Sequence, residues 1–591
     1  MKLRTSFFNF RVLLKNLTRF APLWVLYAVG EVLGLMSLDL GSKAANLAND
    51  LTYIMGTVAI FHMVYAALVA ACLFGDLFDG RMCNGLHAMP MKREGWLITN
   101  LLSGLVFALI PAVVGGGVAM LFLEKYWWIA LIWQGTSLLQ FIFFFGLAVF
   151  CAMCTGKRIG MIAMYAILNF LSMLVFWIAD SLYEPMLTGV VISDFWYAKL
   201  CPVVSLAGSM YLNFHYDSIL GAFFQGFYSE SFYYLYICAG IGVVFMLLAW
   251  LLYRKRALET AGDFISFRPM RIFFLLAYTL AVGVLLYSFG DDFLGMNEGY
   301  GFLVVGILIG WFTGWMLLER TAKIFNKKVL LSFAAFVILF VGSMGITMLD
   351  PLGIVTYIPE TQEIAAANLY LQSDIYYYES DDGWAGWDIT DPDEIAWVQD
   401  LHQSMLGTSE NTGEAGKRTY FTDRLKSMFM VGPVDMEEEY ITTNVRYRLK
   451  NGRDVYRTYR VPAKSETLEE LRPFFSDLRS LLAVNDWEEV KSNMRDIVVY
   501  RHDKDGYNEL FTDAQKEALF AAIEADSKAG TLVQHSCFHE NENVVAGIDL
   551  TWDITYKLSD MGEISGTRGY HIVVFEDSIN TLAFLETLPQ T

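Results

Sequence analysis

Long apolar runs dominate the first 350 residues of the chain. A helix needs roughly 20 apolar residues to cross a hydrocarbon layer about 30 Å thick. Nine runs approach or reach this length, and they lie at residues 21–38, 54–75, 97–123, 127–151, 160–179, 232–253, 272–290, 301–318 and 329–348. The pattern therefore predicts an α-helical polytopic membrane protein with about nine transmembrane helices.

The basic residues fall in alternate loops between these runs. The segments on one side carry nineteen Lys and Arg residues, whereas the opposite loops carry only Lys43, Lys125 and Lys199. Because short loops rich in Lys and Arg remain in the cytoplasm, we expect a cytoplasmic N-terminus, and nine spans then place the C-terminal part outside. A cleaved signal peptide is the alternative for the first run, but it is long for one and the tail would keep its side.

After Asp350 the pattern changes to that of a globular α+β domain. Asp391-Pro392 is a start signal for a helix over 393–405. Asn451-Gly452 lies between two alternating runs and predicts a hairpin with a type I′ turn. Thr512 with Gln515 forms a capping box for a helix ending near residue 526. We expect further strands near 532–538, 546–556 and 568–575, and a last helix after Asp577.

The charge is concentrated in this C-terminal domain. Residues 1–350 carry 22 basic and 19 acidic residues, whereas residues 351–591 carry 21 basic and 43 acidic ones. The net charge of −19 therefore originates in the tail. Such an acidic domain argues against nucleic acid as a partner and against docking on an anionic lipid surface. We expect an acidic extracellular α+β domain over 350–591.

Two groups of residues in the chain suggest chemistry at a site. His535, Cys537 and His539 alternate and would share one face of a strand, and imidazole and thiolate are ligands for zinc or copper. A polar strand face without metal is the favoured interpretation, because a fourth ligand would have to come from elsewhere. Glu31 lies within the first apolar run, where a carboxylate is costly and is often functional. It is a candidate for the transport path or an inward-facing structural group.

The segment before the first apolar run has the pattern of an amphipathic helix over residues 1–20. Phe7, Phe10, Leu14 and Leu17 recur at steps of three and four, and Arg11, Lys15 and Arg19 form a neighbouring basic stripe. A helix of this kind lies on the inner surface of a membrane. We expect it to contact lipid headgroups or a protein partner.

The loop over residues 76–95 is broken by Gly80, Gly85 and Pro90 and ends in a Lys-Arg-Glu cluster. It contains the run Leu86-His87-Ala88-Met89-Pro90-Met91-Lys92-Arg93-Glu94. This run resembles the segment between the second and third spans of ABC-2-type transporter permeases of Gram-positive bacteria. Residues 1–20 and a six-span core over 21–253 are similar to that family as well. Without the resemblance, Lys92 and Arg93 would suit an ordinary anchor at a helix end.

The resemblance implies a role for the loop and for partners of the chain. In that family the loop is a coupling helix that docks on a separate ATP-binding subunit, and two permeases pair as a homodimer or heterodimer. The implied coupling residues here are Leu86, His87, Met89, Pro90, Lys92, Arg93 and Glu94. Three further spans over 254–349 and the outer domain resemble a subset of these permeases, through the run from Tyr447 to Pro462. The implied function is a permease in a bacterial cell membrane, expected to export its substrate.

The sequence contains no nucleotide-binding loop of its own. The nearest candidate, Gly156-Lys157-Arg158, lacks the upstream Gly and the following Ser or Thr. If ATP drives the protein, another chain must bind it, so we expect no cofactor in this chain. We also find no arrangement of residues for catalysis and expect no enzyme activity. The alternative function is a membrane sensor whose outer domain binds a ligand and whose helices signal to a cytoplasmic partner.

Overall fold

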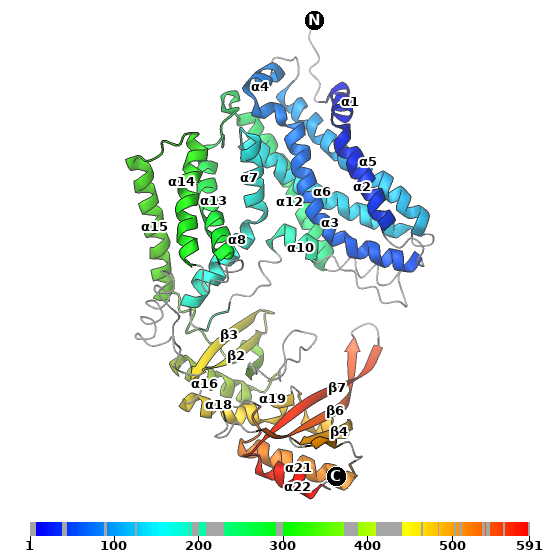
Figure 1. Cartoon of the computed structure of the whole chain (residues 1–591), viewed down its shortest axis with the longest axis vertical. Coiled ribbons are helices and arrows are strands. Elements are labelled where there is room, and N and C mark those ends of the chain that lie inside the picture. Colours follow the sequence, from blue (N-terminus) through cyan, green and yellow to red (C-terminus); the bar gives the residue numbers. More distant parts are fainter. Residues whose placement is uncertain are drawn as a thin grey trace. The chain divides into compact units, whose positions relative to one another are not determined.

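The fold is seen in a computed structural model of the whole chain (Figure 1). It describes residues 8–37, 44–87, 92–123, 127–187, 189–191, 200–208, 230–290, 300–371, 388–408, 440–462, 465–482, 484–501, 504–507, 511–534, 538, 544–558 and 562–588. The chain forms two units. The helical unit contains Met1–Asp180 and Ser193–Phe340, and the C-terminal unit contains Ser181–Ile192 and Val341–Thr591.

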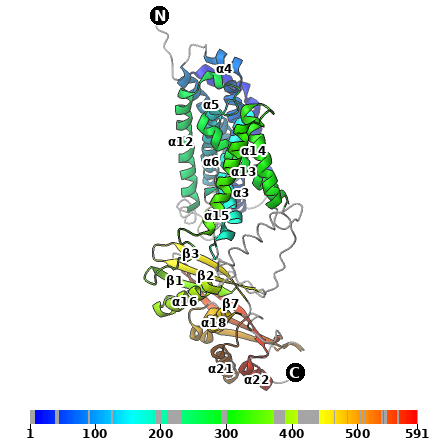
Figure 2. The same ribbon diagram turned by 90° about the vertical axis from the view of Figure 1, so that its left-hand side faces the viewer.

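The helical unit begins with the predicted amphipathic helix and continues through long apolar helices (Figure 2). Its described elements are α1 (Phe10–Arg19), α2 (Ala21–Ser37), α3 (Ala44–Leu73), η1 (Gly75–Phe78), α4 (Gly80–His87), α5 (Arg93–Leu123), α6 (Trp128–Cys154), α7 (Arg158–Asn169), α8 (Leu171–Ile178), α10 (Pro202–Gly208), α12 (Glu230–Lys255), η5 (Leu258–Thr260), α13 (Arg268–Ser288), α14 (Tyr300–Glu319) and α15 (Lys327–Met348).

Six of the described helices are individually long and apolar enough to cross a membrane, namely α5, α6, α12, α13, α14 and α15. Two bent pairs raise the number to eight if each pair forms one span. The axes of α1 and α2 differ by 63°, and those of α7 and the helical segment from Leu171 to Tyr183 differ by 55°. A shorter apolar stretch, Val58–Leu73, lies in α3. The chain is therefore a helical membrane protein, and each predicted apolar run is mainly helical in its described part, with non-helical residues at Phe74, Trp127 and Phe170.

Helix α6 lies at the centre of the unit, with α3, α5 and α12 packed against it. Its rings Phe141, Phe144 and Phe145 are fully buried. Helix α12 approaches most closely at two glycines, because a Cβ on Gly146 would collide with the carbonyl oxygen of Gly242. Small residues permit such close contact between membrane helices. The residue after α12, Arg256, accordingly lies next to the end of α6, where it donates to the Ala152 carbonyl.

The first half of the C-terminal unit is a three-stranded antiparallel sheet covered by helices. Strands β1 (Ile364–Leu371), β2 (Tyr440–Leu449) and β3 (Asp454–Pro462) lie in the order β1-β2-β3. Helices α16 (Pro392–Thr408) and α18 (Glu466–Ser476) pack against it. The predicted hairpin is confirmed, but its type I′ turn is wrong, because Gly452 has a positive φ of 78° and Asn451 does not. The turn thus needs one left-handed residue, which glycine supplies.

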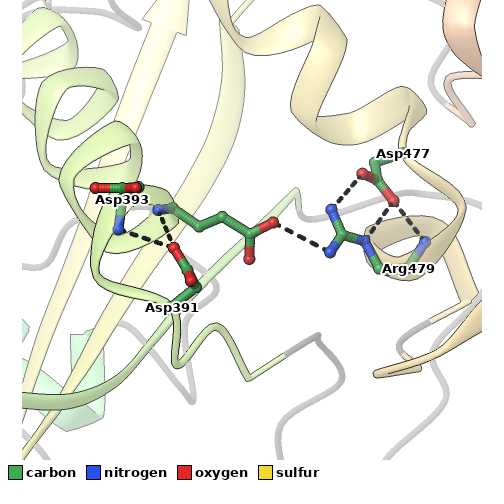
Figure 3. A network of polar contacts seen from close by, with 5 residues as sticks. Asp391, Asp393, Asp477 and Arg479 are labelled. Atoms are coloured by element: carbon green, nitrogen blue, oxygen red, sulfur yellow. Dashed lines mark hydrogen bonds and ion pairs between the residues drawn. The ribbon is translucent and has the colours of Figure 1, made fainter.

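The helix predicted after Asp391-Pro392 is confirmed as α16, and its first turn is held by a network of carboxylates (Figure 3). Asp391 Oδ1 accepts hydrogen bonds from the backbone N–H groups of Asp393 and Glu394, at 2.9 and 3.3 Å. The Glu394 carboxylate pairs with Arg479 at 3.1 Å, and Arg479 also pairs with Asp477 at 2.9 Å. The network joins the start of α16 to the start of α19 (Leu478–Leu482).

The second half contains a four-stranded antiparallel sheet in the order β5-β4-β6-β7. Its strands are β4 (Met494–Arg501), β5 (Lys504–Tyr507), β6 (Val544–Leu558) and β7 (Gly562–Phe575), and its helices are α20 (Trp487–Ser492), α21 (Asp513–Ala529) and α22 (Ile579–Thr587). The capping box of Thr512 and Gln515 is present at the start of α21. The strands predicted near 546–556 and 568–575 and the last helix are confirmed.

The strand predicted near 532–538 is wrong for its described part, residues 532–534 and 538, which lies outside any strand. The reason is that Gln534 uses its side chain where a strand would use its backbone. Its amide nitrogen donates to the Val573 carbonyl at 2.9 Å, and its amide oxygen accepts from the Val573 N–H at 2.6 Å. The edge of β7 is therefore satisfied by a side chain rather than by a paired strand.

A short segment after α8 folds with the C-terminal unit rather than with the helices around it in sequence. It consists of the π-helical turn η3 (Ala179–Tyr183) from Ser181 onward, the turn η4 (Glu184–Met186), Leu187 and residues 189–191. Leu187 and Val190 pack against the core of this unit, and the Gly189 carbonyl accepts a 2.9 Å hydrogen bond from the Thr458 N–H. Gly189 has φ 74°, and a Cβ there would collide with the Tyr459 ring. The sequence did not predict that this segment would pair with the edge of β3.

The end of the chain is anchored by the buried carboxylate of Asp526, and this predicts a measurable effect. Asp526 accepts hydrogen bonds from the Asn580 N–H at 3.1 Å, the Asn580 side chain at 2.8 Å and the Thr581 N–H at 2.7 Å. In Asp526→Asn one oxygen becomes a donor facing these donors, so we expect a loss of about 2 kcal/mol in the local stability of α22. Hydrogen exchange of the α22 amides measures the loss, and Asp513→Asn on the exposed side of α21 is the control.

Candidate coupling site and a polar cluster between the helices

The loop expected to couple to a partner contains the short helix α4 at one end of the helical unit, the end at which α1 also lies (Figure 1). The Asp79 side chain caps α4, since its Oδ1 accepts from the N–H groups of Arg81 and Met82 at 2.8 and 3.2 Å. The side chain of Cys83 is buried against the unit, whereas that of Met82 is 50% exposed. Helix α4 therefore has an inner face that packs and an outer face that is open.

The predicted coupling residues are only partly described. Leu86 and His87 form the last turn of α4, with their side chains outside the described part, and Met89 and Pro90 lie outside the described residues altogether. Lys92 is exposed just before α5. Arg93 and Glu94 begin α5 and face the end of α12, where Arg93 donates to the Arg256 carbonyl at 3.3 Å and Glu94 pairs with Arg254 at 3.4 Å.

Arg256 is the residue that ties this end of the unit together, and sequence reasoning missed it. Its guanidinium donates to the carbonyls of Ala152 at 2.7 Å and Met153 at 3.2 Å, at the end of α6, and to the Leu77 carbonyl of η1 at 3.2 Å. The residue is only 5% exposed, and this burial lowers its pKa. A buried charge is tolerated where it is hydrogen-bonded in this way. One side chain thus links the turn before α4 to α6 and to the end of α12.

The backbone reinforces the same junction. Gly156, after α6, donates its N–H to the Asp263 carbonyl at 2.9 Å and accepts from the Gly262 N–H at 2.7 Å. The Ser266 N–H donates to the Cys154 carbonyl at 2.8 Å. A Cβ on Gly156 would collide with the carbonyl oxygen of Thr260, so this close contact between the two backbone segments requires glycine at position 156. Three backbone hydrogen bonds therefore join the end of α6 to the segment after α12.

Helix α1 packs on α5 through two asparagines rather than through its apolar stripe alone. Asn16 donates to Asn100 Oδ1 at 2.9 Å and to Ser103 Oγ at 3.1 Å, and the Asn9 N–H donates to Thr99 Oγ1 at 3.2 Å. Phe10 and Leu14, from the predicted apolar stripe, are 60% and 45% exposed. The helix therefore has a protein-facing side and an open apolar side, which suits a position at a lipid surface.

Glu31 of α2 lies against α5 and α6. Its Oε2 accepts a 3.3 Å hydrogen bond from the Gln134 amide of α6. A Cβ on Gly115 of α5 would collide with this same oxygen, so the glycine makes room for the carboxylate. One helical turn away, the Tyr27 hydroxyl lies 2.6 Å from His62 Nε2 of α3, and His62 Nδ1 lies 2.9 Å from Gln140 Oε1 of α6. Polar side chains thus join the first apolar helix to α3 and α6.

The predicted metal ligands His535, Cys537 and His539 lie outside the described residues. Among the residues that the structure does describe, no group of three or more His, Cys, Asp or Glu side chains is placed to hold a metal ion. The candidate sites among the described residues are therefore the junction at α4 and the polar cluster at Glu31. Comparisons of the chain with protein-family models, with curated proteins and with solved structures find no match.

Proposed function

We propose that the chain is the membrane-spanning permease subunit of an ABC transporter, an exporter driven by a separate ATP-binding subunit. The observation that carries the proposal is the junction at Arg256. A short helix with an open face, capped by Asp79, is connected through one buried guanidinium to α6 and to the end of α12. A partner that pushes on α4 would move the central helices, which is what coupling to an ATPase requires.

The rest of the proposal follows from the resemblance and from the sequence. The run from Leu86 to Glu94 resembles the coupling segment of ABC-2-type permeases, and the chain has no nucleotide-binding loop. The α4 end, with its basic residues, is then cytoplasmic, the C-terminal unit is extracellular, and two permeases pair around the transport path. Nine spans give this sidedness, with α2 and α3 each crossing once and α7 with α8 crossing as one bent helix.

A co-purification experiment tests this function. The full chain is purified in mild detergent from its native membrane, and bound ATPases are identified by mass spectrometry and by ATP hydrolysis. Met82→Glu places a charge on the open face of α4, and we expect it to reduce the bound ATPase at least about tenfold, because a buried apolar anchor contributes more than 1.4 kcal/mol to an interface.

The matched control is Ile579→Glu, which makes the same type of change at a residue 71% exposed in the C-terminal unit. It should leave ATPase binding unchanged. An intact chain that binds no ATPase, or a Met82→Glu variant that binds it normally, would contradict the permease function.

One observation favours the alternative of a membrane sensor. The C-terminal unit is built from two separate parts of the chain, residues after α8 and residues from the end of α15 onward. A ligand that changes this unit would therefore act on both α8 and α15 through covalent connections. If the partner recovered with α4 is a kinase or a transcriptional regulator rather than an ATPase, the sensor function is supported.

A further inference from the structure

Exposed apolar side chains are concentrated in one part of the C-terminal unit. Among its described residues beyond α15, the large apolar side chains that are exposed are Leu349, Leu352, Ile354, Tyr357, Tyr500 and Ile579. Four of these six lie within residues 349–357, directly after the last residue of α15. We call this segment the apolar loop. Single exposed apolar residues are ordinary, whereas a cluster of them indicates a surface that contacts something other than water.

The apolar loop begins where α15 ends, and Asp350 and Pro351 determine that point. Asp350 has a φ of 43°, in the left-handed region in which many helices end, and Pro351 cannot continue a helix. The Asp350 carboxylate then accepts hydrogen bonds from the N–H groups of Ile354 at 2.8 Å and Val355 at 2.9 Å. The only charged side chain of the loop is therefore satisfied by the loop's own backbone.

The other side of the loop is bonded to β3 through Arg457. Its guanidinium donates to the Ile354 carbonyl at 3.0 Å and to the Tyr357 carbonyl at 3.5 Å, and the residue is only 6% exposed. Val355 packs into the core of the unit. In contrast, Leu349 and Leu352 are 77% and 81% exposed. The loop thus has a buried side that is fixed to β3 and an open side that presents two leucines.

The length of α15 places this open side relative to a membrane. The helix has 22 residues and is therefore about 33 Å long, close to the thickness of a hydrocarbon layer of about 30 Å. Lys327 and Lys328 lie at its other end, and long basic side chains are suited to the boundary between lipid and water. Because Val341–Met348 belongs to the C-terminal unit, the position of the loop at the end of α15 is part of that unit's own structure. The loop accordingly begins where the hydrocarbon layer ends.

Charge determines which kind of lipid contact the loop can make. It contains no Lys or Arg, and its one charged residue is acidic. The domain that follows is acidic as well, so anionic headgroups would repel it. Binding must then come from burial of apolar side chains at the boundary of headgroups and acyl chains, a region in which Tyr is also favoured.

We propose that the apolar loop inserts Leu349 and Leu352 into the lipid surface at the end of α15 and so seats the C-terminal unit on the membrane. The surface that it binds is the boundary of headgroups and acyl chains, without a requirement for anionic lipid. Arg457 connects this lipid contact to β3. The inference rests on α15 as a membrane span and is independent of the permease function, because it involves neither an ATPase nor a substrate.

Fluorescence quenching of the full chain in phosphatidylcholine nanodiscs tests the proposal. Leu352→Cys carries an environment-sensitive fluorophore, and Leu349→Cys provides a second position. We expect both labels to be quenched by a lipid with a nitroxide near its headgroup and to be protected from iodide in the water. Ile579→Cys, at a residue 71% exposed in the same unit, is the matched control and should be quenched by iodide alone. The native chain treated with the same fluorophore gives the background from its own cysteines.

The same labels distinguish the lipid contact from its alternatives. Quenching by the lipid nitroxide that persists at high salt supports apolar insertion. Iodide quenching at 352 as strong as that at 579 overturns the proposal, because the loop then lies in water. Protection from both quenchers also overturns it, since another part of the protein or a second copy then covers the loop. Lipid quenching that requires phosphatidylglycerol and disappears at high salt would show an electrostatic contact and contradict the proposal as well.

Discussion

Replacing Arg256 with alanine is expected to destabilise the helical unit by about 4 kcal/mol, because three buried carbonyls lose a charged donor at once. The carbonyls of Leu77, Ala152 and Met153 belong to two elements that are far apart in sequence. The change therefore separates the turn before α4 from the end of α6. A denaturing-detergent titration of the purified chain measures the loss of stability. If α4 couples to an ATPase, the ATP hydrolysis of the complex should also fall.

Arg254→Ala provides the matched control two residues earlier. Its side chain is 55% exposed and forms one ion pair with Glu94 at 3.4 Å. Exposed ion pairs contribute less than about 1 kcal/mol, so this variant should remain close to the native chain in both measurements. Equal losses in the two variants would show that Arg256 is only one of several basic residues at a helix end and does not hold the junction.

The apolar runs were sufficient to predict the helices, because length and hydropathy are local properties of the chain. The hairpin at Asn451-Gly452 and the cap at Thr512 were predictable for the same reason, since each depends on a few adjacent residues. The turn type was not, because Asn451 and Gly452 allow more than one turn and the four-residue connection between β2 and β3 uses only one left-handed residue. Local signals thus fix the elements more firmly than the details of their connections.

Arg256 shows why the candidate site was only partly predictable. In the sequence, Arg254, Lys255 and Arg256 form one basic cluster after an apolar run, which indicates an anchor on the cytoplasmic side. Arg254 is exposed whereas Arg256 is buried, because carbonyls from η1 and α6 converge on Arg256 alone. No property of the cluster itself distinguishes the two arginines.

The polar cluster was predictable in one of its members. Glu31 was identified because a carboxylate in an apolar run is conspicuous. His62 and Gln140 lie in two other apolar runs and are unremarkable singly, although their polar side chains in such runs were a usable signal. Their connection depends on α3 and α6 packing side by side. The same limit applies to the segment at Gly189, whose contact with β3 spans more than 260 residues of chain.

The C-terminal unit should lose stability as the pH falls, through one buried histidine. His402 of α16 is fully buried against β2 and β3, with Nδ1 3.0 Å from the Tyr447 hydroxyl and Nε2 2.7 Å from the Tyr459 hydroxyl. Burial, with a smaller contribution from the nearby Arg457 guanidinium, lowers the pKa of His402 from 6.5 to about 3. Protonation of the folded state is thus suppressed, whereas the unfolded chain protonates this histidine near pH 6.5.

The sign of the effect follows from proton binding. Above pH 6.5 the histidine is neutral in both states and the contribution to stability is complete. Between pH 6.5 and about 3 the unfolded state binds one more proton, so stability falls with falling pH by about 1.4 kcal/mol per unit. From pH 7 to pH 4 the loss attributable to His402 is about 3 kcal/mol. Other groups titrate in the same range, and the contribution of His402 must be obtained as a difference between variants.

His402→Gln supplies that difference, because glutamine keeps a donor and an acceptor between Tyr447 and Tyr459 but does not titrate. Protection factors for the amides of β2 and β3, measured by hydrogen exchange in the full chain at several pH values, should show a shallower slope in this variant than in the native chain. His571→Gln, at a partly exposed histidine on β7, controls for the loss of any one imidazole. Parallel slopes in the native chain and His402→Gln would mean that solvent reaches the ring readily, so that its burial between the two tyrosines has no consequence for the acid stability of the unit.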